Sequence, residues 1–279
     1  MIAAISFGAA IVVTKRGLRE MSSLGGASIS ITTTAILLWT LTPFLLDLSG
    51  WHGKAVAIFA GVGLFFPAAV TLLNFESNRR MGPTTASTVS GAAPLFAVTA
   101  ALIFLHETLT WLAAAGIAAI VTGVMVLSLS GKDVTRNWPL WVLFIPIGGA
   151  AFRGSAQASI KLGLDLWRNP FAAALIGYTV SAVAILFFAF LFGRNKSLAY
   201  RSDALPHFTF AGILNGFGLL LSYEALGRGQ VTTIAPILAT FPVFTFFLSA
   251  IFLRDERVTA QTVVGVLLTV AGVTLIAAR

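Results

Sequence analysis

One pattern of residues occurs twice along the chain at an almost constant spacing, and this internal repeat is its most constraining feature. Identical residues recur 146 to 149 positions apart: Gly8 and Gly154, Glu76 and Glu224, Arg80 and Arg228, Pro94 and Pro242, and Glu107 and Glu256. Matches of this kind along most of a chain are expected when one structural unit has been duplicated and fused. The repeat therefore predicts two related halves with one shared fold, residues 1–130 and residues 131–279.

The composition places most of the chain in a lipid bilayer. Hydrophobic residues make up 57% of the 279 residues and charged residues only 10%, whereas soluble domains carry about 25% charged residues. In lipid the backbone must satisfy its own hydrogen bonds, which favours helices. The formal net charge is +8, but the basic residues are scattered among short loops, so we predict no nucleic-acid partner. The sequence has no cysteine, which excludes disulfides and thiolate metal sites, and we predict no metal site and no cofactor.

Apolar stretches of about 20 residues, the length needed to cross a membrane, recur throughout the sequence. We predict spanning helices at 28–46, 54–74, 83–105, 109–129, 139–162, 169–192, 205–226, 230–252 and 258–278. Residues 1–14 are apolar but short. Because Gly8 matches Gly154 inside a predicted span, we expect residues 1–14 to form most of a first helix whose beginning is missing or misassigned. The predicted fold is all-α and integral to the membrane, with ten transmembrane helices as two inverted five-helix repeats.

The distribution of basic residues indicates an orientation in the membrane. Twelve of the 18 Lys and Arg residues lie in the loops after predicted helices 1, 3, 5, 7 and 9, and five lie on the opposite side. By the positive-inside rule, the first set of loops would be cytoplasmic and both termini would be outside.

Further repeated motifs give the chain a family likeness. Each half has a Thr-Thr pair, then the repeated proline, then a tight turn running from Glu107 to Thr110 or from Glu256 to Thr259, and a helix with glycines seven residues apart. Over essentially its whole length the chain closely resembles the EamA-type members of the drug/metabolite transporter superfamily. The resemblance implies ten helices around a central cavity, in the inner or plasma membrane, and export or exchange of small metabolites by alternating access. It also implies cytoplasmic termini, against the charge count, and leaves the oligomeric state open, a homodimer included.

Arg153 is the sharpest candidate for substrate binding. Where the family carries an aromatic residue before glycine, this chain has Phe7 in the first half but Arg153 in the second. Arg153 lies well inside the predicted span 139–162, where a charge costs about 2.5–3.5 kcal/mol by insertion scales. A guanidinium there can hold a carboxylate or phosphate bidentately, and Gln157 continues the polar face one turn on. The alternative is that Arg153 bonds helix-end carbonyls or reaches toward one membrane surface.

Other polar or aromatic side chains inside the predicted spans are weaker candidates for lining a cavity. They are Trp39, Tyr178, Asn215 and Ser222. Asn215 and Ser222 share one helix face two turns apart, with Gly218 between them. Helix packing is the alternative for each, because small residues let membrane helices approach closely and buried aromatic residues fill space.

Two repeated carboxylates lie where predicted helices 3 and 8 end. Glu76 is followed four residues later by Arg80, and Glu224 by Arg228, a spacing that suits an ion pair along a helix. A cap or surface ion pair is the simpler interpretation, and proton coupling is the alternative. Glu107 and its repeat counterpart precede helices 5 and 10, where a carboxylate suits the positive end of the helix dipole, so we predict a structural role.

Pro94 and Pro242 occupy matching positions within predicted helices. Proline removes one backbone hydrogen bond and bends a helix. Interrupted helices at matching places in two halves are typical of the centre of a transporter. We predict a hinge or pathway role for both prolines, with a fixed bend as the alternative.

These patterns together predict a secondary transporter of small metabolites, with amino acids or other carboxylated compounds as first candidates. The sequence contains no Gly-x-x-x-x-Gly-Lys-Ser/Thr phosphate loop, so an ion gradient or the substrate's own gradient would drive transport. A channel or a structural membrane subunit is the alternative. A membrane-embedded lipid-modifying enzyme would need acid and base groups gathered at one membrane face. The sequence has only isolated Glu residues in turns, so we predict that the chain is not an enzyme. The expected partners are a small-molecule substrate and the lipid bilayer.

Overall fold

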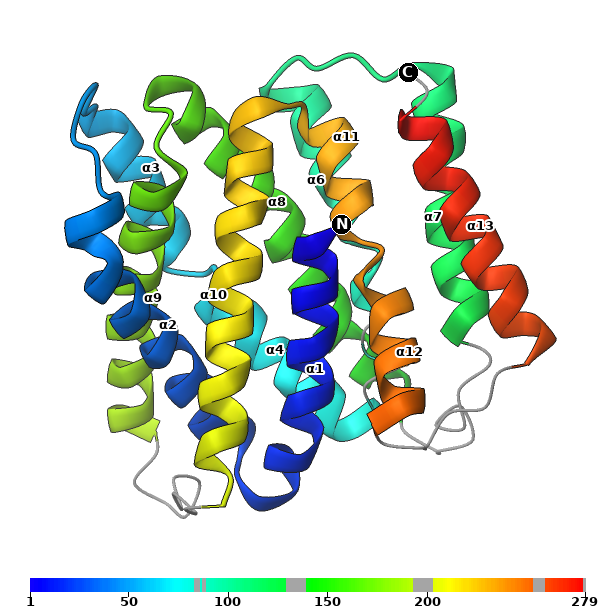
Figure 1. Ribbon diagram of the computed structural model, residues 1–279, viewed down its shortest axis with the longest axis horizontal. Coiled ribbons are helices and arrows are strands. Elements are labelled where there is room, and N and C mark those ends of the chain that lie inside the picture. Colours follow the sequence, from blue (N-terminus) through cyan, green and yellow to red (C-terminus); the bar gives the residue numbers. More distant parts are fainter. Residues whose placement is uncertain (83–85, 87–88, 129–138, 193–202, 253–258, 278–279) are drawn as a thin grey trace.

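The computed structural model describes residues 1–82, 86, 89–128, 139–192, 203–252 and 259–277, and the regular structure within them is helical. The first half contains α1 (Ile2–Glu20), α2 (Ser23–Leu45), α3 (Gly53–Gly63), α4 (Ala68–Met81), α6 (Ala93–Phe104) and α7 (Trp111–Ser128). The second half contains the 3₁₀ turn η2 (Leu140–Leu143), α8 (Phe144–Leu166), α9 (Pro170–Phe192), α10 (Leu205–Arg228), α11 (Val231–Leu238), α12 (Phe241–Phe252) and α13 (Ala260–Ala277). Figure 1 shows one bundle in which α1 and α10 lie side by side near the middle and α7 and α13 form one edge.

Five helical stretches are long and apolar enough to cross a membrane, judged by length and composition. They are Ser23–Leu45, Gly53–Met81, Pro170–Leu191, Leu205–Arg228 and Val231–Phe252, accompanied by the shorter apolar helices Ala93–Phe104, Trp111–Val126 and Val263–Ile276. The all-helical fold predicted from the sequence is confirmed for the described residues. Helices α1 and α8, which correspond in the repeat, are outside this set, and both carry charged residues within their length.

Three predicted spans are interrupted rather than continuous. Turns at 64–67, 91–92 and 239–240 separate the helical segments within them. The second and third turns are 148 residues apart, so the two halves break at the same place in the repeat. Pro94 and Pro242 are the second residues of α6 and α12. The bend expected at each proline is therefore a helix break, with proline in the first turn, where its missing N–H is not needed.

The break between α3 and α4 leaves backbone polar groups that lipid cannot satisfy. The Oγ of Ser181 on α9 donates to the carbonyl oxygen of Gly63 at 2.5 Å and accepts from the amide of Ala68 at 3.2 Å. One buried hydroxyl thus bridges the end of α3 and the start of α4. Its repeat counterpart, Thr34 on α2, donates to the carbonyl oxygen of Gly212 in the unbroken α10 at 2.6 Å. The same contact therefore holds a broken helix in one half and a continuous helix in the other.

Matching N-caps begin α2 and α9. The Oγ of Ser22 accepts a hydrogen bond from the amide of Gly25 at 3.1 Å, and the Oδ1 of Asn169 accepts one from the amide of Ala172 at 2.8 Å. Serine and asparagine are both preferred at this position because their side-chain oxygens satisfy a free N–H of the first turn. The two caps are 147 residues apart, so the repeat extends to the local structure of the helix ends.

The two halves are joined by reciprocal helix crossings at the repeated glycine. A Cβ at Gly8 of α1 would lie 2.9 Å from the amide nitrogen of Thr245 in α12. A Cβ at Gly154 of α8 would lie 2.7 Å from the amide nitrogen of Ala97 in α6. Thr245 and Ala97 correspond in the repeat, because they are 148 residues apart. The first helix of each half therefore packs on a helix of the other half, at a distance that only glycine allows.

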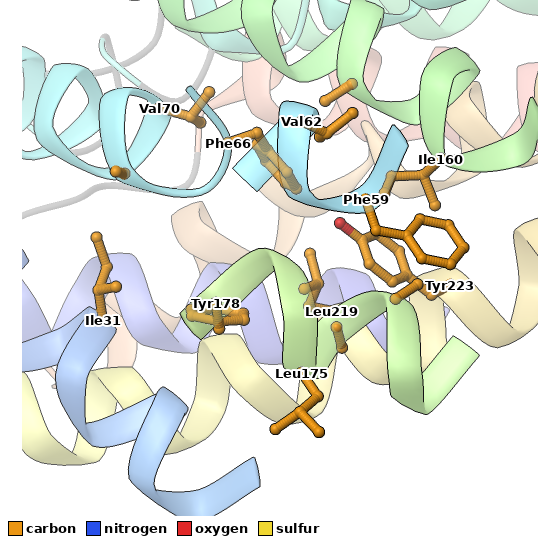
Figure 2. Packing of buried hydrophobic residues seen from close by; sticks show 14 of the residues in the cluster. Ile31, Phe59, Val62, Phe66, Val70, Ile160, Leu175, Tyr178, Leu219 and Tyr223 are labelled. Atoms are coloured by element: carbon orange, nitrogen blue, oxygen red, sulfur yellow. The ribbon is translucent and has the colours of Figure 1, made fainter. Parts of the chain in front are cut away.

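Contacts between phenylalanine and glycine follow the same correspondence. The ring of Phe208 lies over Gly17, and the ring of Phe59 lies over Gly163, so closely that a Cβ at either glycine would overlap the ring. Both phenylalanines are fully buried. Figure 2 shows Phe59 and Tyr223 within the main apolar cluster, which draws residues from both halves.

Helices α7 and α13 pack against each other along their glycines. A Cβ at Gly116 would lie 2.8 Å from the carbonyl oxygen of Gly272, and a Cβ at Gly123 would lie 2.7 Å from that of Gly265. Small residues at a crossing allow this approach in a membrane. Neither helix contributes to the two cavities described below.

Candidate functional site

A cavity of about 40 Å³ lies where α1, α4, α8 and α10 meet. Its walls include Phe7, Thr71, Asn74, Arg153 and Asn215. Phe7 belongs to the first half and Arg153 to the second, and they are counterparts in the repeat, 146 residues apart. The cavity therefore lies between the halves, at a place where counterpart residues face each other.

Arg153 lies against two aromatic rings. Its guanidinium carbon is 5.6 Å from the ring centre of Phe7 and 5.4 Å from that of Phe241, contacts worth about 0.5–2 kcal/mol each. Within the described part of the chain no carboxylate or carbonyl bonds this guanidinium, although Tyr178 is near enough to interact with its charge. The alternative in which Arg153 caps helix-end carbonyls is therefore not what the structure shows. Its N–H donors therefore have no protein acceptor among the described residues.

Two other predicted site residues lie close to Arg153 in the fold. Asn215 of α10 lines the same cavity. Gln157 follows Arg153 by one turn of α8, and its buried Oε1 has no hydrogen-bond partner among the described residues. An unsatisfied buried acceptor of this kind costs about 1–3 kcal/mol. It is suited to accept a hydrogen bond from an N–H or O–H of a ligand.

Tyr178 lies behind the cavity wall rather than on it. It is only 3% exposed and belongs to the main apolar cluster, where Figure 2 shows it among side chains such as Leu219. Its hydroxyl interacts with that of Thr34 on α2. Tyr178 is thus buried near Arg153 and does not line the cavity in this conformation.

The structure does not bring Ser222 or Trp39 to the cavity. The hydroxyl of Ser222 is buried and donates to the carbonyl oxygen of Gly218 in its own helix at 2.7 Å. Trp39 is 56% exposed, and its indole N–H donates to the Oγ1 of Thr179 on α9 at 3.1 Å. Both positions fit the packing alternative that the sequence left open.

The repeated carboxylates occupy ion pairs at the ends of α4 and α10. Glu76 accepts from Arg79 at 2.7 Å and from Arg80 at 2.5 Å. Glu224 pairs with Arg228, and both side chains of that pair are well exposed. Neither carboxylate lines a cavity described here. The geometry therefore favours the structural interpretation over proton coupling.

The two repeated prolines do not line the site, and Pro242 follows a residue that contacts Arg153. Pro94 and Pro242 are not on the cavity walls. Phe241, the residue before Pro242, provides one of the two rings against Arg153. One aromatic ring of the site therefore belongs to the first residue after the helix break at 239–240.

A second void of about 20 Å³ adjoins the first, between α1, α4 and the residues Ala86, Ser90 and Phe241. Its polar groups belong to Thr14, Asn74, Asn78 and Ser90, and Asn74 lines both cavities. The sequence interpretation singled out Arg153 but passed over Thr14 and Asn78. The signal that could have found them is the pair Asn74 and Asn78, one turn apart on a membrane helix.

Comparisons with known proteins agree with this architecture. A family model described as the EamA-like transporter family matches residues 1–129 and 139–278. A solved structure, described only as a crystal structure of a protein, is similar with a TM-score of 0.75 and 15% identity, covering 98% of this chain and 95% of that chain. At that identity the likeness concerns the fold alone. No curated protein matches the chain.

Proposed function

Because the chain belongs to the EamA-like transporter family, we propose that it is a secondary transporter that exports or exchanges a small carboxylated metabolite by alternating access. Family membership makes it a membrane transporter of the drug/metabolite transporter superfamily and confirms the resemblance read from the repeated motifs. The substrate class and the mechanism are our inference, and the environment of Arg153 is the observation that supports them.

Arg153 needs a negative partner that the described residues do not supply. A cation at this depth costs about 2.5–3.5 kcal/mol by insertion scales, and the two aromatic rings attract the charge but offer no hydrogen-bond acceptor to the guanidinium N–H groups. A carboxylate can accept two parallel hydrogen bonds from a guanidinium, which is stronger and more directional than a single contact. Asn215 and Gln157 could then bond the rest of the ligand, for example an amino or hydroxyl group.

The size of the cavity implies a second conformation. About 40 Å³ holds a few water molecules, whereas small-molecule sites usually measure about 300–1,000 Å³. A metabolite can therefore reach Arg153 only if the helices around it separate. The structure fits a closed form of the carrier, and opening toward one side of the membrane at a time is the motion we infer.

The reciprocal contacts between the halves support an inverted arrangement. Gly8 packs on α12 and Gly154 packs on α6, so exchanging the two halves reproduces the same crossings. Five spans per half would make the second half enter the membrane in the opposite sense. Rocking of one half against the other would then open the two sides alternately, with Arg153 near the fixed centre.

The test is ligand-dependent thermal stability of the purified protein in detergent, measured against a panel of carboxylated, neutral and cationic metabolites. A ligand at 100 times its dissociation constant stabilises the folded state by about 2.7 kcal/mol, which corresponds to roughly 5–10 °C for a chain of this size. Arg153→Phe removes the charge, and the first half shows that phenylalanine fits the counterpart position at Phe7. Arg153→Lys keeps the charge but not the planar fork.

We expect carboxylated compounds to stabilise the native protein, to stabilise Arg153→Lys weakly and to leave Arg153→Phe unchanged. Loss of two charge-assisted hydrogen bonds corresponds to about a hundredfold weaker binding. Saturable counterflow of the same compound in proteoliposomes would then separate a carrier from a pore. If neutral or cationic compounds stabilise the native protein and Arg153→Phe equally, the proposed substrate class is wrong.

A further inference from the structure

A groove of about 330 Å³ runs along the outer side of α1, between α10 and α12. Figure 1 shows α1 with these two helices on either side of it. The floor includes Ala9 and Val13 of α1, which are half-buried. The rims carry Phe210 of α10 and Phe252 of α12, which are 52% and 64% exposed. Because α1 belongs to the first half and α10 and α12 to the second, the groove lies on the seam between the halves.

One end of the groove is polar and the rest is hydrocarbon. Arg16 and His207 line the polar end, whereas Leu214 and Leu248 line the apolar walls. Arg16 lies four residues before the end of α1, and His207 is the third residue of α10. Both therefore lie where helices reach the membrane surface. A molecule that fills the groove must be amphipathic, with its polar end at the surface and hydrocarbon along the helices.

The polar end carries a positive charge without a partner. Arg16 is exposed, and its guanidinium makes no hydrogen bond or ion pair in the described part of the chain. The Nδ1 of His207 lies 3.2 Å from the carbonyl oxygen of Asp203, which leaves Nε2 of the ring at the groove. No carboxylate lines the groove within the described residues. A guanidinium offers parallel N–H donors that suit a phosphate group, so this end can hold a phosphate headgroup.

The repeat shows that helix packing does not require these polar groups. The counterpart of Arg16 is Leu162, 146 residues later, and the counterpart of His207 is Ile58, 149 residues earlier. The second spacing is the one found for the matching phenylalanine–glycine contacts described above. The equivalent surface of the other half therefore has aliphatic side chains at both positions. The charge at the end of the α1 groove is an addition to the shared fold, which points to a charged ligand.

We propose that the groove between α1, α10 and α12 binds one anionic phospholipid, with its phosphate at Arg16 and an acyl chain running toward Ala9. Seven residues of α1 separate these positions, about 10 Å at 1.5 Å per residue. This is about one third of the hydrocarbon thickness of a bilayer, so the groove holds the headgroup end of the chain. Basic pockets between membrane helices are known to bind anionic headgroups. The proposal does not depend on the substrate class proposed above.

The length of the apolar part favours a lipid over a small anion. A free phosphate compound could neutralise Arg16, but it would leave the walls around Leu214 and Leu248 uncovered. The groove also shares no lining residue with the cavity at Arg153 among the described residues. It is therefore a separate site and not an extension of the proposed substrate site.

A lipid in this groove would join the two halves, because it contacts α1 on one side of the seam and α10 and α12 on the other. A ligand that binds only the folded chain raises its apparent stability. One basic residue near the membrane surface favours an anionic lipid about fivefold in affinity. At saturation this preference corresponds to a melting temperature about 2–4 °C higher with an anionic lipid than with a zwitterionic one.

The experiment uses the purified full chain in a neutral detergent. Phosphatidylglycerol and phosphatidylcholine with identical acyl chains are titrated separately, and the apparent melting temperature and the number of bound lipids, by native mass spectrometry, are recorded. Glycerol 3-phosphate at constant ionic strength is the probe for the headgroup alone. We expect the larger increase with phosphatidylglycerol, one tightly bound molecule per chain, and no increase with glycerol 3-phosphate.

Three variants test the role of the charge. Arg16→Leu takes the side chain of its counterpart Leu162, and it should respond equally to both lipids. Arg16→Lys keeps the charge and should keep most of the preference for phosphatidylglycerol. Arg19→Leu is the matched control, because Arg19 is exposed at the same end of α1 but does not line the groove. Its preference should equal that of the native protein.

Four results would overturn the site. They are a preference for phosphatidylglycerol that survives in Arg16→Leu, an equal loss in Arg19→Leu, an equal response to glycerol 3-phosphate, and a shift that follows protein concentration rather than lipid. The second would mean that the lipid responds to general surface charge, and the last would assign the groove to a second copy of the chain. A phosphatidylglycerol with a photoreactive acyl chain should label α1, α10 and α12, and even labelling of all helices would contradict the proposal. These measurements need no substrate, so they stand or fall separately from the proposed function.

Discussion

Replacing Glu107 by alanine should weaken the junction between the two halves. Glu107 follows α6 in the first half, and its carboxylate accepts hydrogen bonds from the backbone amides of Val231 at 2.8 Å and Thr232 at 2.9 Å. These amides belong to the first turn of α11 in the second half. A residue of one half therefore caps a helix of the other.

The expected loss of stability follows from the hydrogen-bond acceptors that the amides of Val231 and Thr232 lose. Removing an N-cap side chain costs about 0.5–2 kcal/mol, and hydrogen bonds to a charged group contribute about 1.5–3 kcal/mol each in dry surroundings. Because Glu107 is half-buried, water can hydrogen-bond to the two amides in the variant and offset part of this cost. We expect Glu107→Ala to lower the free energy of unfolding by about 1–2 kcal/mol, and Glu107→Gln, which keeps one acceptor, by roughly half as much.

The assay is the apparent melting temperature in detergent, followed by tryptophan fluorescence. The loss should appear as a decrease of about 3–6 °C for Glu107→Ala. Glu224→Ala is the matched control, because the partner of Glu224 among the described residues is the exposed Arg228. An exposed ion pair contributes about 0–1 kcal/mol, so that variant should stay close to the native protein.

Equal decreases in Glu107→Ala and Glu224→Ala would refute this reasoning. They would mean that the carboxylate of Glu107 acts as an ordinary surface charge. A decrease in Glu107→Gln as large as that in Glu107→Ala would show that charge, and not the two accepted hydrogen bonds, matters at this position.

Three further predictions concern other contacts. Gly154→Ala should lower the free energy of unfolding by about 1–3 kcal/mol, since the new Cβ would lie 2.7 Å from the backbone of α6. The control is Gly61→Ala, where a Cβ has no atom within 4 Å, and its melting temperature should stay unchanged or rise. Ser181→Ala should lower the free energy of unfolding by about 1–3 kcal/mol, because the carbonyl of Gly63 and the amide of Ala68 lose their hydrogen-bond partner at the α3–α4 break. The hydrogen bonds from the side chain and the amide of Ser49 lower the pKa of Asp47, so the turn is stabilised above the ordinary aspartate pKa and loses that support as the pH falls through the lowered value. In Ser49→Ala the pKa of Asp47, followed by NMR titration, should rise toward its ordinary value, and an unchanged titration would contradict the assignment.

The internal repeat carried most of what the sequence could establish about the fold. A spacing of 146 to 149 residues depends on the duplication alone, so it correctly paired Gly8 with Gly154 and Pro94 with Pro242. Arg153 also stood out in the sequence as a candidate, because a charge within an apolar span has few explanations. In the structure Arg153 faces its own counterpart, Phe7, which the repeat implies once the two halves meet at the centre.

The direction in which each side chain points was not visible in the sequence. In a soluble helix the apolar face marks the core, but in a membrane helix lipid and core are equally apolar. Trp39 was therefore kept as a weak candidate for lining a cavity, with packing as the alternative, and its side chain is 56% exposed. Contacts between segments far apart in the sequence were not visible either. Glu107 was expected at the start of its own following helix and instead caps α11, while its counterpart Glu256 lies outside the described residues.

The polar void was hidden because its members are far apart in sequence. Thr14 and Asn78 are each unremarkable alone, since a single hydroxyl or amide in a membrane helix often bonds its own backbone. Only the fold brings α1 against α4 and places these groups around one space. The counterparts of Thr14 and Asn78 in the other half are Ile160 and Leu226. This difference shows that the fold does not require polar side chains at these positions.

The reciprocal crossings have a consequence for how the chain is made. When the ribosome has released residue 130, α1 is already in the membrane, but α10 and α12, its main packing partners, have not been synthesised. The first half must wait in the bilayer with Gly8 and Gly17 unpacked until residues beyond 205 arrive. A nascent chain stalled between the halves should therefore be accessible to membrane quality-control proteases. Two separately expressed halves should each be short-lived alone and persist only when both are produced in the same cell.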